Sequence, residues 1–468
     1  MTPSFALAAL FALAAQAPAT DPPPAAEPPK DEAPAAPPEA TPPAEAPKDA
    51  SPPPEAVKPV EPPKVEEPKK AEKPKDEKLA LVLGDLSVTP RAQLRVRGES
   101  IGNKTLQPDL APATIFTHRA RLGLGAEWKD VGRFVVDMQD VRGWGAEVTA
   151  APPAPQDVTL FGKVANSVDM HQAFAGVFIG PTELRVGRQE IAFANERVLG
   201  AVDWVQQARA FDAISIANKA PGDFGYLAFC SIVRDLDHTP TATAPGLALC
   251  GVGVEHKIMP AFRYAPLVMV EATDNETLLS RATFGARFDG AVAGFSYDVD
   301  AFGQTSWVGT DVKLAYLAGV RAAYEVDTML KPKAGITFDY VSGGDPATAD
   351  VVTFNTTYGT NHKFYGFQDL FLNLPVDTAN RGLLDAALNL AVKEGPFSAQ
   401  LAVHVFGPTA GDGGGALYGI EPDLVGKYDL TKQVSLQVGG SLFVPVGEAL
   451  GRGDQTTPWA FAMLDVKL

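Results

Sequence analysis

The sequence predicts an all-β fold: an antiparallel transmembrane β-barrel of about 18 strands, preceded by a disordered Pro-rich arm. From residue 87 to residue 468, short segments alternate apolar and polar residues, and the turns between them are alternately short and long. The segments number eighteen, and an even number returns both ends of a barrel to one side. In such a barrel one parity faces lipid and the other a wet lumen. A soluble β-sandwich explains the alternation but not the turn lengths.

Residues 1–19 have the features of a secretory signal peptide. Residues 5–15 are almost wholly apolar, and Ala15-Gln16-Ala17 or Ala17-Pro18-Ala19 offers a small-x-small cleavage site. The first four residues lack Lys and Arg, so a disordered hydrophobic tail is the alternative. We expect an exported chain without a helical membrane anchor, because no later run approaches the roughly 20 apolar residues of a spanning helix.

Residues 20–80 differ in composition from everything that follows. They are dominated by Pro, Ala, Glu and Lys, and no aromatic residue occurs from residue 13 to residue 115. Such a segment buries too little apolar surface to offset its ordering entropy, so we expect a disordered arm with local polyproline structure. The arm is expected to be a periplasmic spacer, or else to contact peptidoglycan or periplasmic export machinery.

The composition excludes several classes of function. The formal net charge of −16 argues against a nucleic-acid partner. Two cysteines provide neither a disulfide framework nor a thiolate zinc cluster, and the six histidines show no metal-ligand spacing. We therefore expect no metal and no cofactor. An enzymatic barrel would need a Ser–His pair on its outer face, and neither His171 nor His404 is supported as a base, so we expect no enzyme.

Eighteen strands are expected, with bounds uncertain by a few residues. They are residues 91–99, 116–128, 133–142, 168–179, 183–191, 209–217, 224–234, 247–257, 262–272, 278–289, 291–304, 310–326, 333–341, 380–393, 397–406, 417–430, 433–446 and 458–468. Short turns such as 129–132 alternate with long loops such as 143–167, as in outer-membrane barrels. The longest connection, residues 342–379, suggests a gate folded into the lumen.

The polar parity of these strands predicts the lumen lining. Eleven arginines lie between residues 91 and 209. Arginines on the polar parity include Arg95, Arg97, Arg119, Arg121 and Arg185. Carboxylates share this parity, so most of the charged residues are expected to form ion-paired ladders along the wall. A minority of the arginines would form an anion-selective track, because the guanidinium fork matches a carboxylate or phosphate.

Cys230 and Cys250 lie on neighbouring expected strands, symmetrically about Pro240. Antiparallel pairing would place them opposite each other, and the periplasm is oxidising. A cross-strand disulfide that fixes a loop base is one interpretation, and two free buried thiols are the other.

Several motifs go beyond alternation. Residues 185–190 (RVGRQE), 195–200 (NERVLG), 203–204 (DW) and 209–212 (RAFD) resemble the hallmark run of the alginate-export family. Residues 139–145 (QDVRGWG), 169–174 (DMHQAF) and 362–371 (HKFYGFQDLF) are similar to further motifs of that family, in the same order. The resemblance runs from about residue 90 to residue 468.

The resemblance implies an outer-membrane porin of a Gram-negative cell whose arginine-lined constriction passes an anionic polysaccharide outward. Carried over by motif, the candidate constriction residues and the network holding them are Arg142, Arg188, Glu190, Arg197, Arg209 and Asp212. On strict alternation Arg142, Arg188 and Asp212 fall on the lipid-facing parity, where a charge at mid-membrane costs about 2–4 kcal/mol. They must lie beyond the apolar band or follow a bulge that resets the parity.

Three functions remain open from the sequence. The leading one is a channel for an alginate-like polysaccharide or a related anionic solute. The second is a general small-solute porin. The third is a structural barrel whose Pro-rich arm tethers the outer membrane to the cell wall.

Overall fold

The computed structural model describes most of the chain from residue 80 onward. The described residues are 80–102, 113–144, 167–218, 223–233, 247–273, 280–308, 310–345, 347–410, 417–446, 450 and 453–468. The expected signal peptide and the arm up to residue 79 lie outside the described residues. Among the residues that are described, no helix is both long enough and apolar enough to span a membrane.

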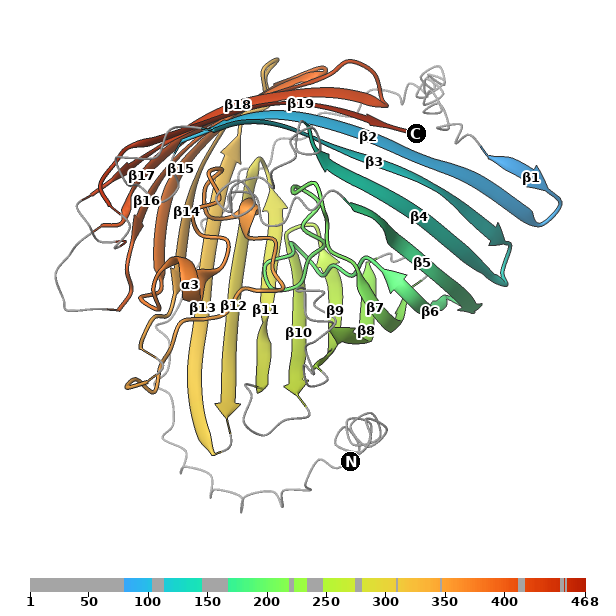
Figure 1. Ribbon diagram of the computed structural model, residues 1–468, viewed down its shortest axis with the longest axis horizontal. Helices are drawn as coiled ribbons and strands as arrows, with labels where there is room; N and C mark the ends of the chain where they lie inside the picture. Colours follow the sequence, from blue (N-terminus) through green and yellow to red (C-terminus); the bar gives the residue numbers. More distant parts are fainter. Residues whose placement is uncertain are drawn as a thin grey trace, which may run out of the picture. The chain divides into compact units, whose positions relative to one another are not determined.

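The described residues form nineteen antiparallel strands, of which eighteen, β2 to β19, close into a barrel (Figure 1). The strands are β1 (Leu81–Leu83), β2 (Leu86–Ile101), β3 (Ala113–Trp128), β4 (Gly132–Gly143), β5 (Ser167–Ile179), β6 (Thr182–Gln189), β7 (Phe211–Asn218), β8 (Phe224–Val233), β9 (Leu247–Met259), β10 (Phe262–Thr273), β11 (Ser280–Val292), β12 (Phe295–Val308), β13 (Asp311–Glu325), β14 (Lys333–Val341), β15 (Leu383–Glu394), β16 (Phe397–Gly407), β17 (Gly419–Asp429), β18 (Val434–Pro445) and β19 (Thr457–Lys467). Each strand from β2 to β19 pairs with its sequence neighbours, and β19 pairs with β2 to close the ring. The expected fold class and strand number are confirmed.

The short strand β1 was not expected from the sequence. It pairs with β2 from Leu81↔Val88 to Leu83↔Leu86, and Gly84 in the connecting turn has a φ of 61°. A positive φ suits glycine because it has no Cβ. With this hairpin the chain enters the barrel at the end where the short turns lie, which is also the end where β19 finishes. We refer to this end as the turn side and to the opposite end as the loop side.

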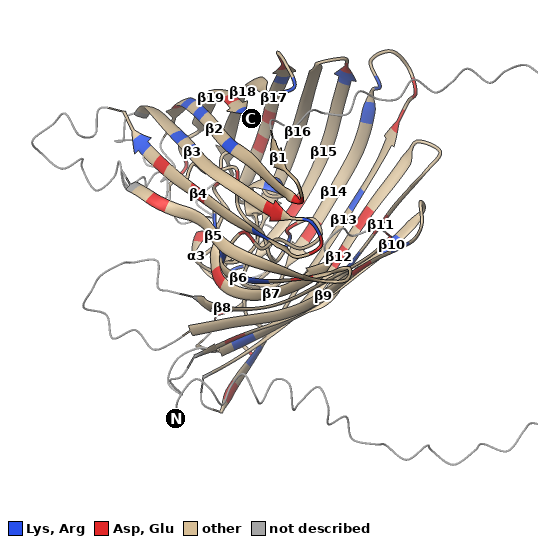
Figure 2. Cartoon of the chain, turned by 90° about the vertical axis from the view of Figure 1, so that its right-hand side faces the viewer, with Lys and Arg blue, Asp and Glu red and all other residues tan. Residues whose placement is uncertain are grey.

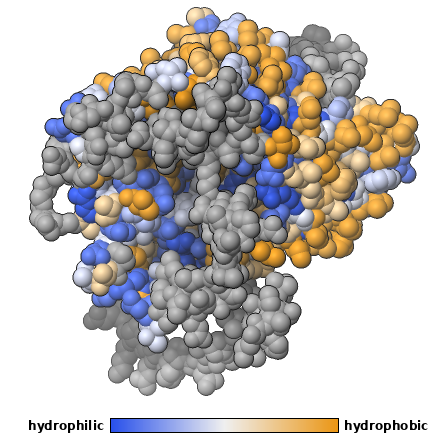
Figure 3. All heavy atoms as spheres, viewed as in Figure 1, coloured by the Kyte–Doolittle hydropathy of each residue, from blue (hydrophilic) through white to orange (hydrophobic). Residues whose placement is uncertain are grey.

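The two faces of the wall have opposite chemistry. On β3, Leu122 and Leu124 are 69% and 56% exposed on the outside, whereas Arg119 on the other parity is fully buried. Most residues of the strands are uncharged, and Lys, Arg, Asp and Glu occur only at scattered positions along them (Figure 2). Hydrophobic side chains cover much of the upper and right-hand surface, while hydrophilic ones are concentrated in the middle and at the left of the view (Figure 3). This is the arrangement that a lipid-embedded barrel requires.

Two connections fold into the ring. We call residues 190–210, between β6 and β7, the strap, and residues 342–382, between β14 and β15, the insert. The insert contains the short helices η1 (Asn361–Lys363) and α3 (Leu374–Asp377). Its Phe371 packs in an apolar cluster against Phe406 and Phe443, which lie on the lumen side of β16 and β18. The longest connection therefore does occupy the lumen, as the sequence suggested.

Candidate functional site

Four arginines gather on the lumen side of two neighbouring strands. Alternation on β2 places Arg95 and Arg97 inward, and alternation on β3 does the same for Arg119 and Arg121. The register puts Arg95 directly opposite Arg119. These four residues, here called the arginine cluster, are largely buried, so their like charges require counter-charges close by.

Asp203 on the strap supplies a counter-charge that three members of the cluster share. Its Oδ1 accepts a hydrogen bond from Arg119 Nη2 at 2.8 Å and one from Arg121 Nη1 at 3.4 Å. Its Oδ2 accepts from Arg95 Nη2 at 3.3 Å. Burial by itself would raise the pKa of the Asp203 carboxyl, but the three guanidinium charges outweigh it and hold the pKa below its ordinary value. The strap therefore presents a fixed negative charge to the cluster.

The cluster also donates hydrogen bonds to the main chain of the strap. Arg95 Nη1 donates to the carbonyl oxygen of Asp203 at 2.6 Å, and Arg119 Nη1 donates to that of Val205 at 3.2 Å. Arg97 donates to the carbonyl oxygen of Trp204, and its guanidinium lies 4.2 Å from the centre of the Trp204 ring. Charged donors form stronger hydrogen bonds than neutral ones, and a cation over an aromatic face adds to them. The strap is thus seated on the β2–β3 wall.

Glu190 joins this site from the start of the strap. Its Oε1 lies 2.6 Å from His171 Nε2 and 3.8 Å from Arg121 Nη1. Arg185, also expected in the lumen, is held separately: its Nη2 donates to Glu183 at 2.8 Å, and its guanidinium lies 5.6 Å from the Phe174 ring. Glu190 therefore belongs with the arginine cluster, whereas Arg185 lies nearer the turn side.

Arg197, which lies between Glu190 and Asp203 in the strap, contacts the opposite wall of the barrel. Its Nη2 lies 2.6 Å from Asp339 on β14, and its Nε lies 3.9 Å from Asp300 on β12. Its guanidinium also lies 4.2 Å from the ring centre of Phe364 in the insert. Because β12 and β14 stand across the ring from β2 and β3, the strap crosses the lumen.

The strap and the insert are bonded to each other. Arg209 donates to the carbonyl oxygens of Tyr358 and Thr357 at 2.6 and 2.7 Å. Burial lowers the pKa of Arg209 to about 10, so it remains charged at neutral pH. Glu196 accepts from Thr360 at 2.6 Å and pairs with Lys363.

Trp204 adds an aromatic contact between the two segments. Its ring stacks on that of His362, with ring centres 4.1 Å apart. The two segments therefore form one body that fills much of the lumen.

Arg142, Arg188 and Asp212 lie elsewhere, on the outer face. They occupy the loop-side ends of β4, β6 and β7 and remain partly exposed. Arg188 Nη1 lies 3.5 Å from Asp212 Oδ2, and Arg142 Nε lies 2.9 Å from Asp140 Oδ1. Strict alternation therefore placed these three residues on the correct face. Their position at the loop-side margin resolves the conflict with the apolar band, and it separates them from the arginine cluster.

The structure links Cys230 on β8 to Cys250 on β9 through a disulfide, and the register pairs the two residues directly. Both lie on the parity opposite to lumen-facing Phe229 and Leu249, so the disulfide faces outward. It therefore lies on the face of the wall opposite to the strap and the insert.

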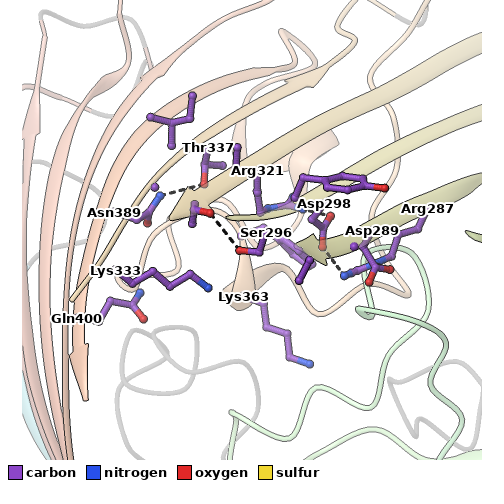
Figure 4. A pocket seen from close by; sticks show the side chains of 18 of the residues that line it. Arg287, Asp289, Ser296, Asp298, Arg321, Lys333, Thr337, Lys363, Asn389 and Gln400 are labelled. Carbon is purple, nitrogen blue, oxygen red and sulfur yellow. Dashed lines mark hydrogen bonds and ion pairs between the residues drawn. The ribbon is translucent and has the colours of Figure 1, made fainter. Parts of the chain in front are cut away.

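Two cavities lie on the turn side of the strap and insert. The larger, about 550 Å³, is lined by β11–β16 and by residues 362–367 of the insert. Figure 4 shows Lys333 extending into it, with Asn389 bonded to Thr337 and Gln400 nearby. The second, about 380 Å³, is lined by Arg185 and Glu190 among others. No group of residues within the described ranges could hold a metal ion.

Sequence reasoning missed the residues that organise the site. Asp203 and Trp204 entered only as part of a motif, and Glu196 was quoted within another, none with a role. Lys333 and Lys363 in the larger cavity were not candidates. Asp203 is the one carboxylate between Glu196 and Asp212 in a run that resembles the family, and this isolation was the available signal.

The comparisons with known proteins address the family and the fold. No curated protein matches the chain. Among solved structures, Acinetobacter baumannii OccAB4 is similar with a TM-score of 0.56 and 10% identity, covering 81% of this chain and 98% of that one. Pseudomonas aeruginosa OpdK, solved with vanillate, is similar with a TM-score of 0.55 and 8% identity, with the same coverage. At such low identity these likenesses show the fold alone.

The family model described as alginate export matches residues 88–232 and 253–374. These ranges make up more than half of the chain, and they include the arginine cluster, the strap and most of the insert. The chain therefore belongs to the alginate export family.

Proposed function

We propose that this porin passes an anionic solute bearing carboxylates, such as an alginate-like polysaccharide. The observation that carries the proposal is the arginine cluster, four guanidinium groups on adjacent lumen-facing positions of β2 and β3. Guanidinium binds carboxylates through two parallel hydrogen bonds, so a line of arginines offers successive sites to a polyanion. Closely spaced sites allow an ion to leave one as it reaches the next.

The larger cavity supports the same solute class. Its cationic side chains outnumber its carboxylates: Arg287, Arg321, Lys333 and Lys363 against Asp289 and Asp298. Neutral hydrogen-bonding groups, Ser296, Thr337, Asn389 and Gln400, line the same space and suit the hydroxyl groups of a sugar. A solute that combines carboxylates with hydroxyls matches this lining better than a simple anion does.

A small-solute porin is the second candidate, favoured by the size of the free space. The cavities measure about 550 and 380 Å³, and the strap and insert fill the lumen between them and the loop side. Volumes of this size accommodate small molecules. Vanillate, present in the OpdK structure, is a small carboxylate of that kind. We infer transport rather than catalysis in either case, which membership of a porin family supports.

Single-channel recording in planar bilayers tests the proposal. The reversal potential under a KCl gradient reports ion selectivity, and oligogalacturonates of two to six units serve as the polyanionic probe. We expect anion selectivity and current block by the oligomers that strengthens with length. Neutral maltooligosaccharides of equal length are the control and should block weakly.

The outcomes separate the candidates. Block by digalacturonate that does not strengthen with length would favour a small-solute porin. Cation selectivity without block would overturn the anionic-solute proposal while leaving the fold and family intact. Arg188→Gln, on the outer face, should behave as the unmodified protein and so controls for any change of charge.

A further inference from the structure

Asp203 occupies the position that a carboxylate of the solute would need. Its two oxygens meet three guanidinium groups, at 2.8 Å from Arg119, 3.3 Å from Arg95 and 3.4 Å from Arg121. The Asp203 side chain is 47% exposed, whereas those three arginine side chains are between 0% and 14% exposed. A half-exposed carboxylate thus covers three nearly buried cations on the lumen side.

We propose that Arg95, Arg119 and Arg121 form the carboxylate-binding site of the channel, and that Asp203 is its resident occupant until a solute carboxylate displaces it. The inference rests on the proposed function and deepens it, because it names the atoms that the solute contacts. It makes binding an exchange of one carboxylate for another. The net charge around the arginines then stays the same before and after exchange.

The arginines keep their positions when Asp203 leaves. Arg95 Nη2 also lies 3.0 Å from Asp465 on β19, and Arg119 Nη2 donates to Gln93 at 3.0 Å. Arg121 Nε donates to Gln139 at 2.7 Å. These partners belong to the barrel wall, so the three guanidinium groups remain oriented and an incoming carboxylate meets a preformed site.

The exchange requires only rotation of the Asp203 side chain. The strap stays seated because arginine side chains hold the carbonyl oxygens of residues 203–206 independently of that carboxylate. Trp204 further anchors the strap between Arg97 and His362. The site can therefore open while the main chain of the strap stays in place.

The cavity of about 380 Å³ approaches the site from the turn side. Glu190 lines the cavity of about 380 Å³, and its carboxylate lies 3.8 Å from Arg121. Glu190 is therefore the side chain that separates a small solute in that cavity from Arg121. Glu190 itself is held by His171 at 2.6 Å, which keeps it from taking the place of Asp203.

The experiment removes the charge of the occupant. Asp203→Asn keeps the size of the side chain but cannot compete as an anion. We expect digalacturonate to block the current at about tenfold lower concentration than in the unmodified channel, with little change in the unblocked conductance. Maltose block should not change. Asp212→Asn removes a carboxylate from the outer face and should leave the digalacturonate block unchanged. Asp203→Glu keeps a carboxylate at this position and should show the same block as the unmodified channel.

The failures are distinguishable. If the unmodified channel is anion-selective and blocked by digalacturonate, but Asp203→Asn shows the same block concentration, this inference is overturned and the proposed function stands. If the unmodified channel shows neither anion selectivity nor block by digalacturonate, the proposed function itself is overturned. Heat-modified gel mobility checks that each barrel is folded. Asp203→Ser provides a second neutral variant, and adding Arg119→Gln to Asp203→Asn should abolish the gain.

Discussion

The arginine cluster and the aromatic packing of the insert hold the same two-segment body to the barrel by different forces. On the β2–β3 wall, the strap is held by charged hydrogen bonds to carbonyl oxygens and to Asp203. On the β16–β18 wall, Phe371 of the insert packs among Phe406, Tyr418 and Phe443, and all four are fully buried. Only the first set of contacts resembles what an anionic solute can offer in exchange.

The difference indicates that the strap and the insert have different roles within the lumen. Apolar packing is non-directional and indifferent to the charge of a passing solute. Ion pairs respond to salt, to pH and to competing carboxylates. The insert is thus the fixed part of the body, and the strap carries the part that responds. The experiments below test this division, beginning with the largest expected effect.

Loss of the aromatic packing should have the strongest effect. Replacing a fully buried Phe by Ala costs about 3–5 kcal/mol. We expect Phe371→Ala to release the insert, to expose it to protease cleavage and to raise the single-channel conductance several-fold. Val376→Ala on the same insert is the control, since Val376 is 68% exposed. An intact insert in Phe371→Ala would contradict the fixed role given to this side.

Loss of one cluster arginine should have a smaller effect. Arg119→Gln removes the donor to Asp203 and to the carbonyl oxygen of Val205, at a cost of about 1–3 kcal/mol to the seating of the strap. We expect the anion-to-cation permeability ratio, measured from the reversal potential, to fall several-fold while the insert stays protected from protease. Equal cleavage of strap and insert would show that the two sides are not independent.

Acid should act on the arginine side through Asp203. Its pKa is lowered in the folded protein, so its ion pairs contribute fully above the unfolded value of about 3.9 and are lost as pH falls through the folded value. We expect the digalacturonate block to be steady from pH 7 to about pH 5, since galacturonate carboxyls also stay ionised there. Anion selectivity measured with KCl alone should rise in the unmodified channel only at a pH well below the ordinary value of about 3.9, where Asp203 itself becomes protonated. In Asp203→Asn this rise should be smaller.

Salt should give the smallest effect. The Debye length falls from about 10 Å at 0.1 M to about 3 Å at 1 M ionic strength. We expect the difference in block concentration between Asp203→Asn and the unmodified channel to shrink at 1 M KCl. Protease protection of the insert should not change with salt. A salt-dependent release of the insert would show that charge also holds the aromatic side.

Much of the fold could be predicted from the alternation of apolar and polar residues along each strand. Alternation identified the eighteen barrel strands and the inward direction of Arg95, Arg97, Arg119 and Arg121, because each strand obeys one local rule. Alternation failed to describe β5, where Met138 pairs with Met170 and Asp137 pairs with Gln172. This bulge turns both His171 and Gln172 toward the lumen.

The centre of the site could not be predicted in the same way. Asp203 is separated from Arg95 by 108 residues, and its place depends on how the strap crosses the lumen. No local pattern encodes that path, which is set by contacts of the strap with two opposite walls of the barrel. The motif that contains Asp203 marked the region, but only the structure shows which of its side chains meets the arginines.

Because the arginines donate to main-chain carbonyl oxygens, many side chains of the strap can be substituted without loss of these hydrogen bonds. A carbonyl oxygen is present in every residue, so Val205 or Gln206 can be replaced without removing an acceptor from Arg119. What must persist is the backbone path, which includes Val202 at a φ of 52°, an unfavourable value for a β-branched residue. The strap can therefore vary at Val205 and Gln206 and keep its place on the wall, whereas Asp203 and Trp204 act through their side chains.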